Sequence, residues 1–165
     1  MKIGLISDTH SYFDPQIREF FSDRDEIWHA GDIGSRDVIT SLEKLAPVRA
    51  VYGNIDDALI RAEFPEDLFF DCEGIKVWIT HIGGYPGRYN QRTRTILANN
   101  KLDLFICGHS HILKVIPDKK HQLLHINPGA AGFHGFHKFK TLIRFTIESG
   151  KIQNLEAIEL GKRGI

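Results

Sequence analysis

Two histidines one residue apart, His109 and His111, lie in the stretch LFICGHSHIL, where they follow a glycine between two apolar runs. Imidazole nitrogens are common ligands of divalent transition metals. An isolated H-x-H pair is more often simply two loop residues at the end of a strand. The residues that follow the other apolar runs of the chain decide between these two interpretations.

Side chains that can bind a metal also follow four other apolar runs. They are Asp8 and His10 in SDTH, Asp32 in HAGDIG, Asn54 in YGNID and His81 in THIGG. The carboxyl ends of parallel strands share one edge of a sheet, where open α/β folds bind their ligands. Seven such side chains are too many for one ordinary metal ion, whereas two ions that share a bridging carboxylate would use all of them.

The runs that would position these side chains are short and apolar with little alternation, which is typical of strands buried on both faces. The expected strands span Ile3–Ser7, Glu26–Ala30, Val48–Tyr52, Lys76–Thr80 and Leu104–Cys107.

Helical patterns lie between the first of these strands, at Pro15–Ser22 and at Arg36–Leu45, with Asp14 and Ser35 as the expected N-caps. Strands that alternate with helices predict parallel βαβ units.

The second half of the chain changes character, because turn signals now separate neighbouring strand-like runs. Hairpin turns are expected at Glu73-Gly74, around Asp118–Lys120 and at Ser149-Gly150, with a helix over Tyr89–Asn100. No linker or repeat interrupts the chain, so we expect one domain over residues 1–165, in which the two halves form facing sheets with helices outside.

The composition is that of an ordinary globular protein: 42% of the 165 residues are hydrophobic, and 21 acidic residues balance 21 basic ones. This balance argues against a broadly basic nucleic-acid surface. Two cysteines, Cys72 and Cys107, are too few for a disulfide framework. The start MKIGLIS is too short for a signal peptide and no run reaches the ~20 apolar residues of a membrane span, so a cytoplasmic location without a membrane is expected.

Taken in order, the motifs DTH, GDIG, GNID, the isolated His81 and GHSH resemble the signature of the calcineurin-like metallophosphoesterases. The resemblance extends from Met1 to Gly129 and includes NPG at Asn127–Gly129. It is strongest to the small phosphodiesterase class to which the retromer subunit Vps29 is also related. The fold that it implies is α/β, a four-layer αββα sandwich of two mixed β-sheets flanked by helices.

The resemblance also implies two divalent metal ions per chain, with manganese expected and iron, zinc, nickel or cobalt as alternatives. The first ion would be held by Asp8, His10, Asp32 and His111. The second would be held by Asp32, Asn54, His81 and His109, so that Asp32 bridges. A hydroxide between the two ions would attack a small phosphodiester, with Asp32, Asn54 and His109 as the catalytic residues.

Three positions depart from the family pattern. Ile55 replaces a histidine that can donate a proton near the leaving oxygen, so alkyl phosphomonoesters are expected to be poor substrates. Ala130 stands where serine is frequent, which weakens the expectation that this loop binds phosphate. The segment Gly83–Arg88 is either an exposed turn or a flexible lip that brings Arg88 to a substrate phosphate. Beside Ile55, Asp56 either orients the site or is an ordinary surface carboxylate.

Two other functions fit the same motifs. A non-catalytic protein-interaction scaffold like Vps29 would be expected to have lost ligand residues, and a nuclease would need a basic face. The remaining histidines are not expected to be ligands: His29, His121, His125, His134 and His137. Phe133 and Phe136 could support a homodimer, while the expected partner at the site is a small phosphoester.

Overall fold

The computed structural model describes residues 1–164, in which strands and helices alternate through the first half. In chain order the elements are β1 (Lys2–Ile6), α1 (Ile17–Phe21), β2 (Glu26–His29), α2 (Arg36–Glu43), β3 (Val48–Ala50), α3 (Ala58–Glu63), β4 (Asp67–Cys72), β5 (Ile75–Thr80), α4 (Gln91–Asn99), β6 (Leu104–Ile106), β7 (Leu113–Asp118), β8 (Leu123–Pro128), β9 (Phe139–Glu148) and β10 (Lys151–Lys162).

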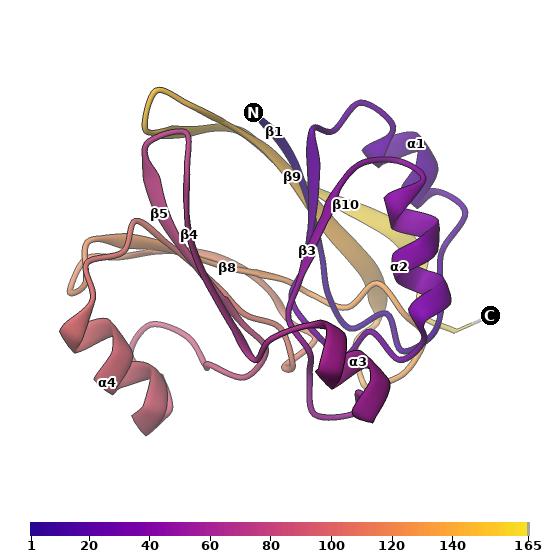
Figure 1. Cartoon of the computed structure of the whole chain (residues 1–165), viewed down its shortest axis with the longest axis horizontal. Coiled ribbons are helices and arrows are strands. Elements are labelled where there is room, and N and C mark those ends of the chain that lie inside the picture. Colours follow the sequence, from indigo (N-terminus) through magenta and orange to yellow (C-terminus); the bar gives the residue numbers. More distant parts are fainter. Residues whose placement is uncertain (165) are drawn as a thin grey trace.

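The strands form two five-stranded mixed sheets, in the orders β10-β9-β1-β2-β3 and β4-β5-β6-β8-β7. The pairs β1–β2, β2–β3, β5–β6 and β6–β8 are parallel, and the pairs β1–β9, β9–β10, β4–β5 and β7–β8 are antiparallel. The sheets face each other, with α1 and α2 outside one sheet and α4 outside the other (Figure 1). The predicted four-layer αββα sandwich is therefore confirmed.

Three hydrophobic clusters hold the four layers together. Between the sheets, residues such as Leu5 and Trp28 pack against Ile79. Ile27 joins the cluster under α1 and α2, and Phe105 joins the one under α4. Each fully buried large side chain contributes roughly 1.5–3 kcal/mol. The central strands are buried on both faces. The carboxyl ends of the parallel strands are therefore held at fixed positions.

The helix at the first expected position begins later than the sequence predicts. Asp14 is not the formal N-cap of α1, which starts at Ile17, but its carboxylate accepts a hydrogen bond of 3.0 Å from the Gln16 backbone N–H. Asp14 thus caps the turn that leads into the helix. In α2 the expected cap is confirmed, because the Ser35 side chain accepts from the Asp37 backbone N–H.

The C-terminal hairpin departs from the expectation that each half of the chain forms its own sheet. Strand β9 pairs antiparallel with β1, with Phe145 opposite Ile3. Its side chains are buried on both faces, since Ile143 lies between the sheets and Leu142 lies toward the helices. A central place in the first sheet is the position that buries both faces.

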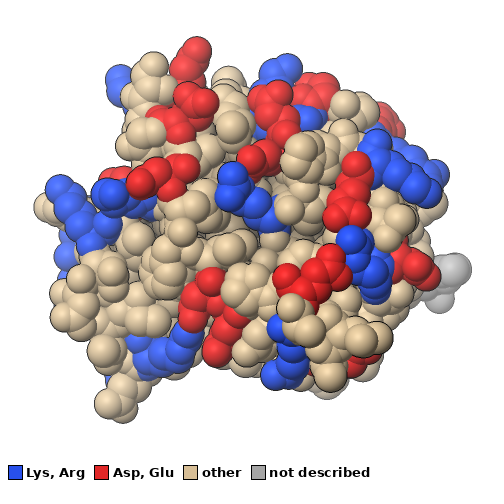
Figure 2. Space-filling view, viewed as in Figure 1, with Lys and Arg blue, Asp and Glu red and all other residues tan. Residues whose placement is uncertain are grey.

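A short helix, α3, was not predicted. Its N-cap Asp57 accepts hydrogen bonds from the backbone N–H groups of Leu59 and Ile60. No helix within residues 1–164 is long and apolar enough to cross a membrane. Figure 2 shows basic and acidic side chains interspersed over the face in view, without an extended area of one charge.

Candidate metal centre

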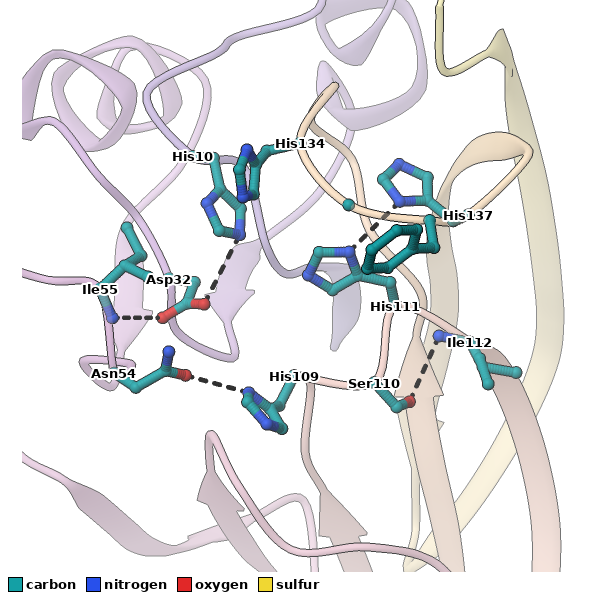
Figure 3. Close-up of a pocket in the computed structure, with 12 residues that line it drawn as sticks. His10, Asp32, Asn54, Ile55, His109, Ser110, His111, Ile112, His134 and His137 are labelled. Atoms are coloured by element: carbon teal, nitrogen blue, oxygen red, sulfur yellow. Dashed lines mark hydrogen bonds and ion pairs between the residues drawn. The ribbon is translucent and has the colours of Figure 1, made fainter.

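The site lies where the parallel strands end, as the sequence predicts. Loops after β1, β2, β3 and β6 meet there around a cavity of about 430 Å³, whose lining includes His10, Asp32, Asn54, His109 and His111 (Figure 3). His81, which follows β5, lies buried behind them. Five segments that are far apart in the sequence thus bring the seven candidate ligands to one place.

The first group of possible ligands consists of Asp8, His10 and His111, whose ligand atoms all lie within 4.8 Å of one another. The Asp8 Oδ1 atom is 3.0 Å from His111 Nε2 and 3.9 Å from His10 Nε2. Its other oxygen, Oδ2, accepts hydrogen bonds from the Ser7 hydroxyl and the His109 backbone N–H. Asp8 is therefore held so that only Oδ1 faces the two imidazoles.

Hydrogen bonds define the tautomer of His111. The His137 Nε2 atom lies 2.8 Å from the Gly132 carbonyl oxygen, which can only accept, so this nitrogen carries the proton. Burial lowers the pKa of His137, which keeps its ring neutral and makes Nδ1 an acceptor. That atom lies 3.2 Å from His111 Nδ1, which must donate. The His111 Nε2 lone pair then faces Asp8 Oδ1, an arrangement that a cation between them would stabilise.

The second group consists of Asp32, His81 and His109. The His81 Nδ1–H donates to the Ala30 carbonyl over 2.8 Å, so Nε2 is the nitrogen that can bind a metal, and it lies 3.2 Å from Asp32 Oδ2. Asn54 joins this group, because its Oδ1 lies 3.0 Å from His109 Nδ1.

Asp32 lies between the two groups. Its Oδ2 is 3.5 Å from His10 Nε2 in the first group and 3.2 Å from His81 Nε2 in the second. Its Oδ1 accepts a hydrogen bond from the Ile55 backbone N–H. This is the position that a bridging carboxylate would need.

The donor set fits divalent cations. Within residues 1–164, three buried atoms that face the centre have no hydrogen-bond partner, namely Asp8 Oδ1, His10 Nε2 and His81 Nε2. Buried polar atoms are nearly always satisfied, so such a cluster requires a cause, and a bound cation would supply the missing interactions. Carboxylate, imidazole and amide ligands suit manganese, iron or zinc.

The ionisation of the site is consistent with ligand roles. Burial would raise the pKa of Asp32, but the neighbouring His81 outweighs this effect and lowers the pKa below its usual value. Burial lowers the pKa of His10 and of His109, which leaves both neutral. Burial also opposes the charge on His81, yet Asp32 and Asp8 raise its pKa. A proton and a metal ion therefore compete for this last nitrogen.

Five of the candidate ligands have a left-handed backbone, with φ between 45° and 68°: Asp8, His10, Asp32, His109 and His111. Non-glycine residues rarely adopt this conformation, and it is concentrated at functional sites. Gly53 fits closely against the centre, because a Cβ atom there would lie 2.1 Å from Asp32 Oδ1.

Asp56 is not a surface carboxylate, which settles one alternative that the sequence left open. It is buried and accepts hydrogen bonds from the backbone N–H groups of Ile33, Gly34 and Gly53. It thereby ties the loop after β2 to the loop after β3. Arg61 of α3, which the sequence analysis did not identify, supports the same loop by donating to the backbone carbonyls of Asp56 and Asn54.

Two histidines that were not expected to be ligands, His134 and His137, lie beside the centre in Figure 3. The His134 ring is 4.8 Å from the His10 ring, and His137 orients His111 as described. Neither belongs to the two groups of possible ligands. His29 is also close, since its ring contacts Thr9 Oγ1 and the Gly31 backbone N–H. Only the density of histidine in GFHGFH, between two turns, could have indicated this loop.

The remaining positions that were singled out lie at the rim. Ile55 is 44% exposed and lines the cavity, as do Ile112 and the fully exposed Phe136. Arg88 does not line this cavity but a neighbouring one.

Comparisons with known proteins identify the family of the chain. A family model described as a calcineurin-like phosphoesterase superfamily domain matches residues 1–150. A probable metallophosphoesterase of Methanothermobacter thermautotrophicus is 35% identical over 137 residues, which cover 79% of this chain and 77% of that protein. A phosphodiesterase of Methanocaldococcus jannaschii is 31% identical over 146 residues, covering 78% of this chain and 83% of that protein.

The fold is also shared with Vps29, a protein whose name does not describe a phosphoesterase. The crystal structure of Vps29 from Entamoeba histolytica, complexed with zinc, superposes with a TM-score of 0.74 at 18% identity, covering 96% of this chain and 99% of that one.

Proposed function

Because the chain belongs to the calcineurin-like phosphoesterase superfamily, we propose that it hydrolyses a small phosphodiester at a centre of two divalent metal ions bridged by Asp32. The single observation that supports this best is the position of Asp32 Oδ2, between His10 of one ligand group and His81 of the other. The proposed ligands are the seven residues Asp8, His10, Asp32, Asn54, His81, His109 and His111.

Two bound divalent ions would supply positive charge for the phosphate oxygens and lower the pKa of a water molecule to near neutrality. The protein's own part is to hold the ligands rigidly before substrate arrives. Asp56 fixes the loops that carry Asp32 and Asn54, and His137 fixes the ring of His111. Such preorganised charge is usually the largest contribution to phosphoryl transfer.

The rim of the cavity supports a diester with a good leaving group. Ile55 cannot donate a proton, and with Ile112 and Phe136 it gives the entrance an apolar character. An apolar or aryl arm would contact these side chains, whereas a basic alkoxide would lack a proton donor at Ile55.

The test is hydrolysis of bis(p-nitrophenyl) phosphate by protein that has been stripped with a chelator and reloaded with Mn²⁺. We expect about two ions per chain, turnover that chelation abolishes, and loss of both in Asp32→Asn. Asp37→Asn is the matched control, because Asp37 is an exposed carboxylate on α2. A protein that binds two ions but turns over no phosphoester would refute the proposal.

A non-catalytic scaffold is the second candidate, since the fold is shared with Vps29. Ligand-type residues at all seven positions favour the enzyme. Failure to bind any metal specifically, together with no turnover, would favour the scaffold. A nuclease is disfavoured by the balance of 21 acidic and 21 basic residues.

A further inference from the structure

A second cavity, of about 270 Å³, lies beside the metal centre. The segment after β5 forms one wall with Tyr85 and Arg88, and Lys114 of β7 and His125 of β8 form another. His109 and Ser110 line this cavity and the metal cavity alike. A molecule bound at the centre could therefore reach into the second cavity past these two residues.

The charge of the second cavity is positive. Arg88 and Lys114 are among its lining residues, which include no aspartate or glutamate. Within residues 1–164 neither cation forms an ion pair with a carboxylate, in contrast to Arg36, Arg49 or Arg92. The Lys114 ammonium instead lies 3.4 Å from the centre of the Tyr85 ring. The two charges are thus available to an anion.

The lining also includes a buried polar group without a partner. The His125 side chain is fully buried, and neither ring nitrogen has a hydrogen-bond partner among the described residues. Aromatic rings flank it, since the Phe105 ring is 5.3 Å away and the Tyr89 ring 6.0 Å away. Burial, reinforced by the charge of Lys114, lowers the pKa of His125 to about 4. The neutral ring has one N–H to donate, and a ligand oxygen would satisfy it.

We propose that this cavity binds a second phosphate of the substrate, held by Arg88, Lys114 and His125. The substrate class is then a phosphodiester that carries a further phosphate on one of its arms, such as a phosphorylated nucleotide ester. A neutral arm would leave two cations without a carboxylate or phosphate and a buried imidazole without a hydrogen-bond partner. This inference rests on the proposed function for the reaction, but the binding of phosphate does not depend on it.

The first test compares two substrates that differ by one phosphate: the p-nitrophenyl ester of thymidine 5′-phosphate, and the same ester with an added 3′-phosphate. We expect kcat/KM to be higher for the phosphorylated ester by about tenfold or more, since charge-assisted hydrogen bonds are the strong ones. The preference should fall to near unity in the double variant Arg88→Met, Lys114→Met. Lys119→Met, an exposed lysine at the β7–β8 turn, is the control and should keep it.

The second test needs no catalysis. Inorganic phosphate titrated into chelator-treated protein should shift the ring resonances of His125, and the shift should disappear in the same double variant. Hydrolysis of both esters at equal rates would overturn this inference and leave the proposed function standing. Phosphate binding to a protein that hydrolyses neither ester would support this inference and overturn the proposed function. If phosphate does not bind and the wild-type preference is absent, the cavity has no such role. His125→Gln, which keeps an N–H donor, checks that any loss follows from the contact and not from unfolding.

Discussion

The imidazole of His29 should make the stability of this protein sensitive to mild acid. Its Nδ1 accepts the Gly31 backbone N–H over 3.1 Å, and its Nε2 lies 2.9 Å from Thr9 Oγ1. The Thr9 hydroxyl donates its proton to the Ile33 carbonyl, so His29 Nε2 must donate to Thr9. In the neutral ring, Nε2 therefore carries the proton and Nδ1 is the acceptor. A second proton on Nδ1 would point at the Gly31 N–H.

The expected size follows from the pKa. Burial lowers the pKa of His29 from 6.5 to about 4. Between these values the unfolded chain binds a proton that the folded protein does not, so the free energy of unfolding falls as the pH decreases. One pKa unit corresponds to about 1.4 kcal/mol, so the loss attributable to this ring reaches about 2.5 kcal/mol at pH ~4.5 and levels off below pH ~4.

The assay is urea unfolding of the wild-type protein and His29→Gln, both treated with a chelator, at pH ~7.5 and pH ~4.5. At the higher pH the variant should be less stable by about 1–3 kcal/mol, because it loses buried hydrogen bonds. At the lower pH this deficit should shrink by about 2.5 kcal/mol, because glutamine does not titrate. Comparing the two proteins cancels the groups that titrate independently of His29. A deficit of equal size at both pH values would show that His29 is not held neutral by its surroundings.

Three further predictions concern the centre. Asp32→Asn should remove most metal affinity from both groups, whereas His111→Ala should weaken mainly the metal affinity of the first group. Elemental analysis of the purified variants distinguishes these results, and two ions retained in Asp32→Asn would exclude Asp32 as a bridge. Asp56→Asn should lower metal affinity by roughly 10–100-fold and reduce the Tm, because an amide cannot accept all three backbone N–H groups; unchanged metal titrations would contradict this. Ile55→His should raise turnover of alkyl esters relative to aryl esters at equal metal content, and an unchanged ratio would show that Ile55 does not set the preference.

Much of the convergence of the ligand residues could be predicted from the sequence, because one geometric rule governs it within each sheet. Within a sheet the parallel strands end at one edge, so the polar residues after β1, β2 and β3 had to lie together, as did those after β5 and β6. The two edges meet because the two sheets face each other (Figure 1). The apolar runs were short and bounded by glycine, which made those strands easy to assign. The two hairpin turns of the second sheet were equally local, since each depends on a few adjacent residues.

Other features depend on contacts between residues distant in the sequence, and no local pattern encodes them. The partnership of His111 with His137 spans 26 residues and requires that the loop after β8 fold back over the centre. The place of β9 beside β1 depends on which strand can bury both faces, and only the assembled sheet decides this. Asp56 could be read either way from GNID, because the sequence does not state which backbone N–H groups lie within its reach.

The backbone of the centre bears on whether it is a functional site or a remnant. Left-handed conformations at residues other than glycine cost on the order of 1–3 kcal/mol each, and five of them occur at the candidate ligands. The buried Asp8 Oδ1, His10 Nε2 and His81 Nε2 atoms lack hydrogen-bond partners within residues 1–164, which adds a further cost. A surface that only docks another protein would gain nothing from strain and unsatisfied lone pairs directed at one interior point. Bound cations would offset both, because they need lone pairs that converge and a backbone that turns sharply to present them. The same arrangement that destabilises the metal-free fold is therefore what a metal-dependent phosphoesterase requires.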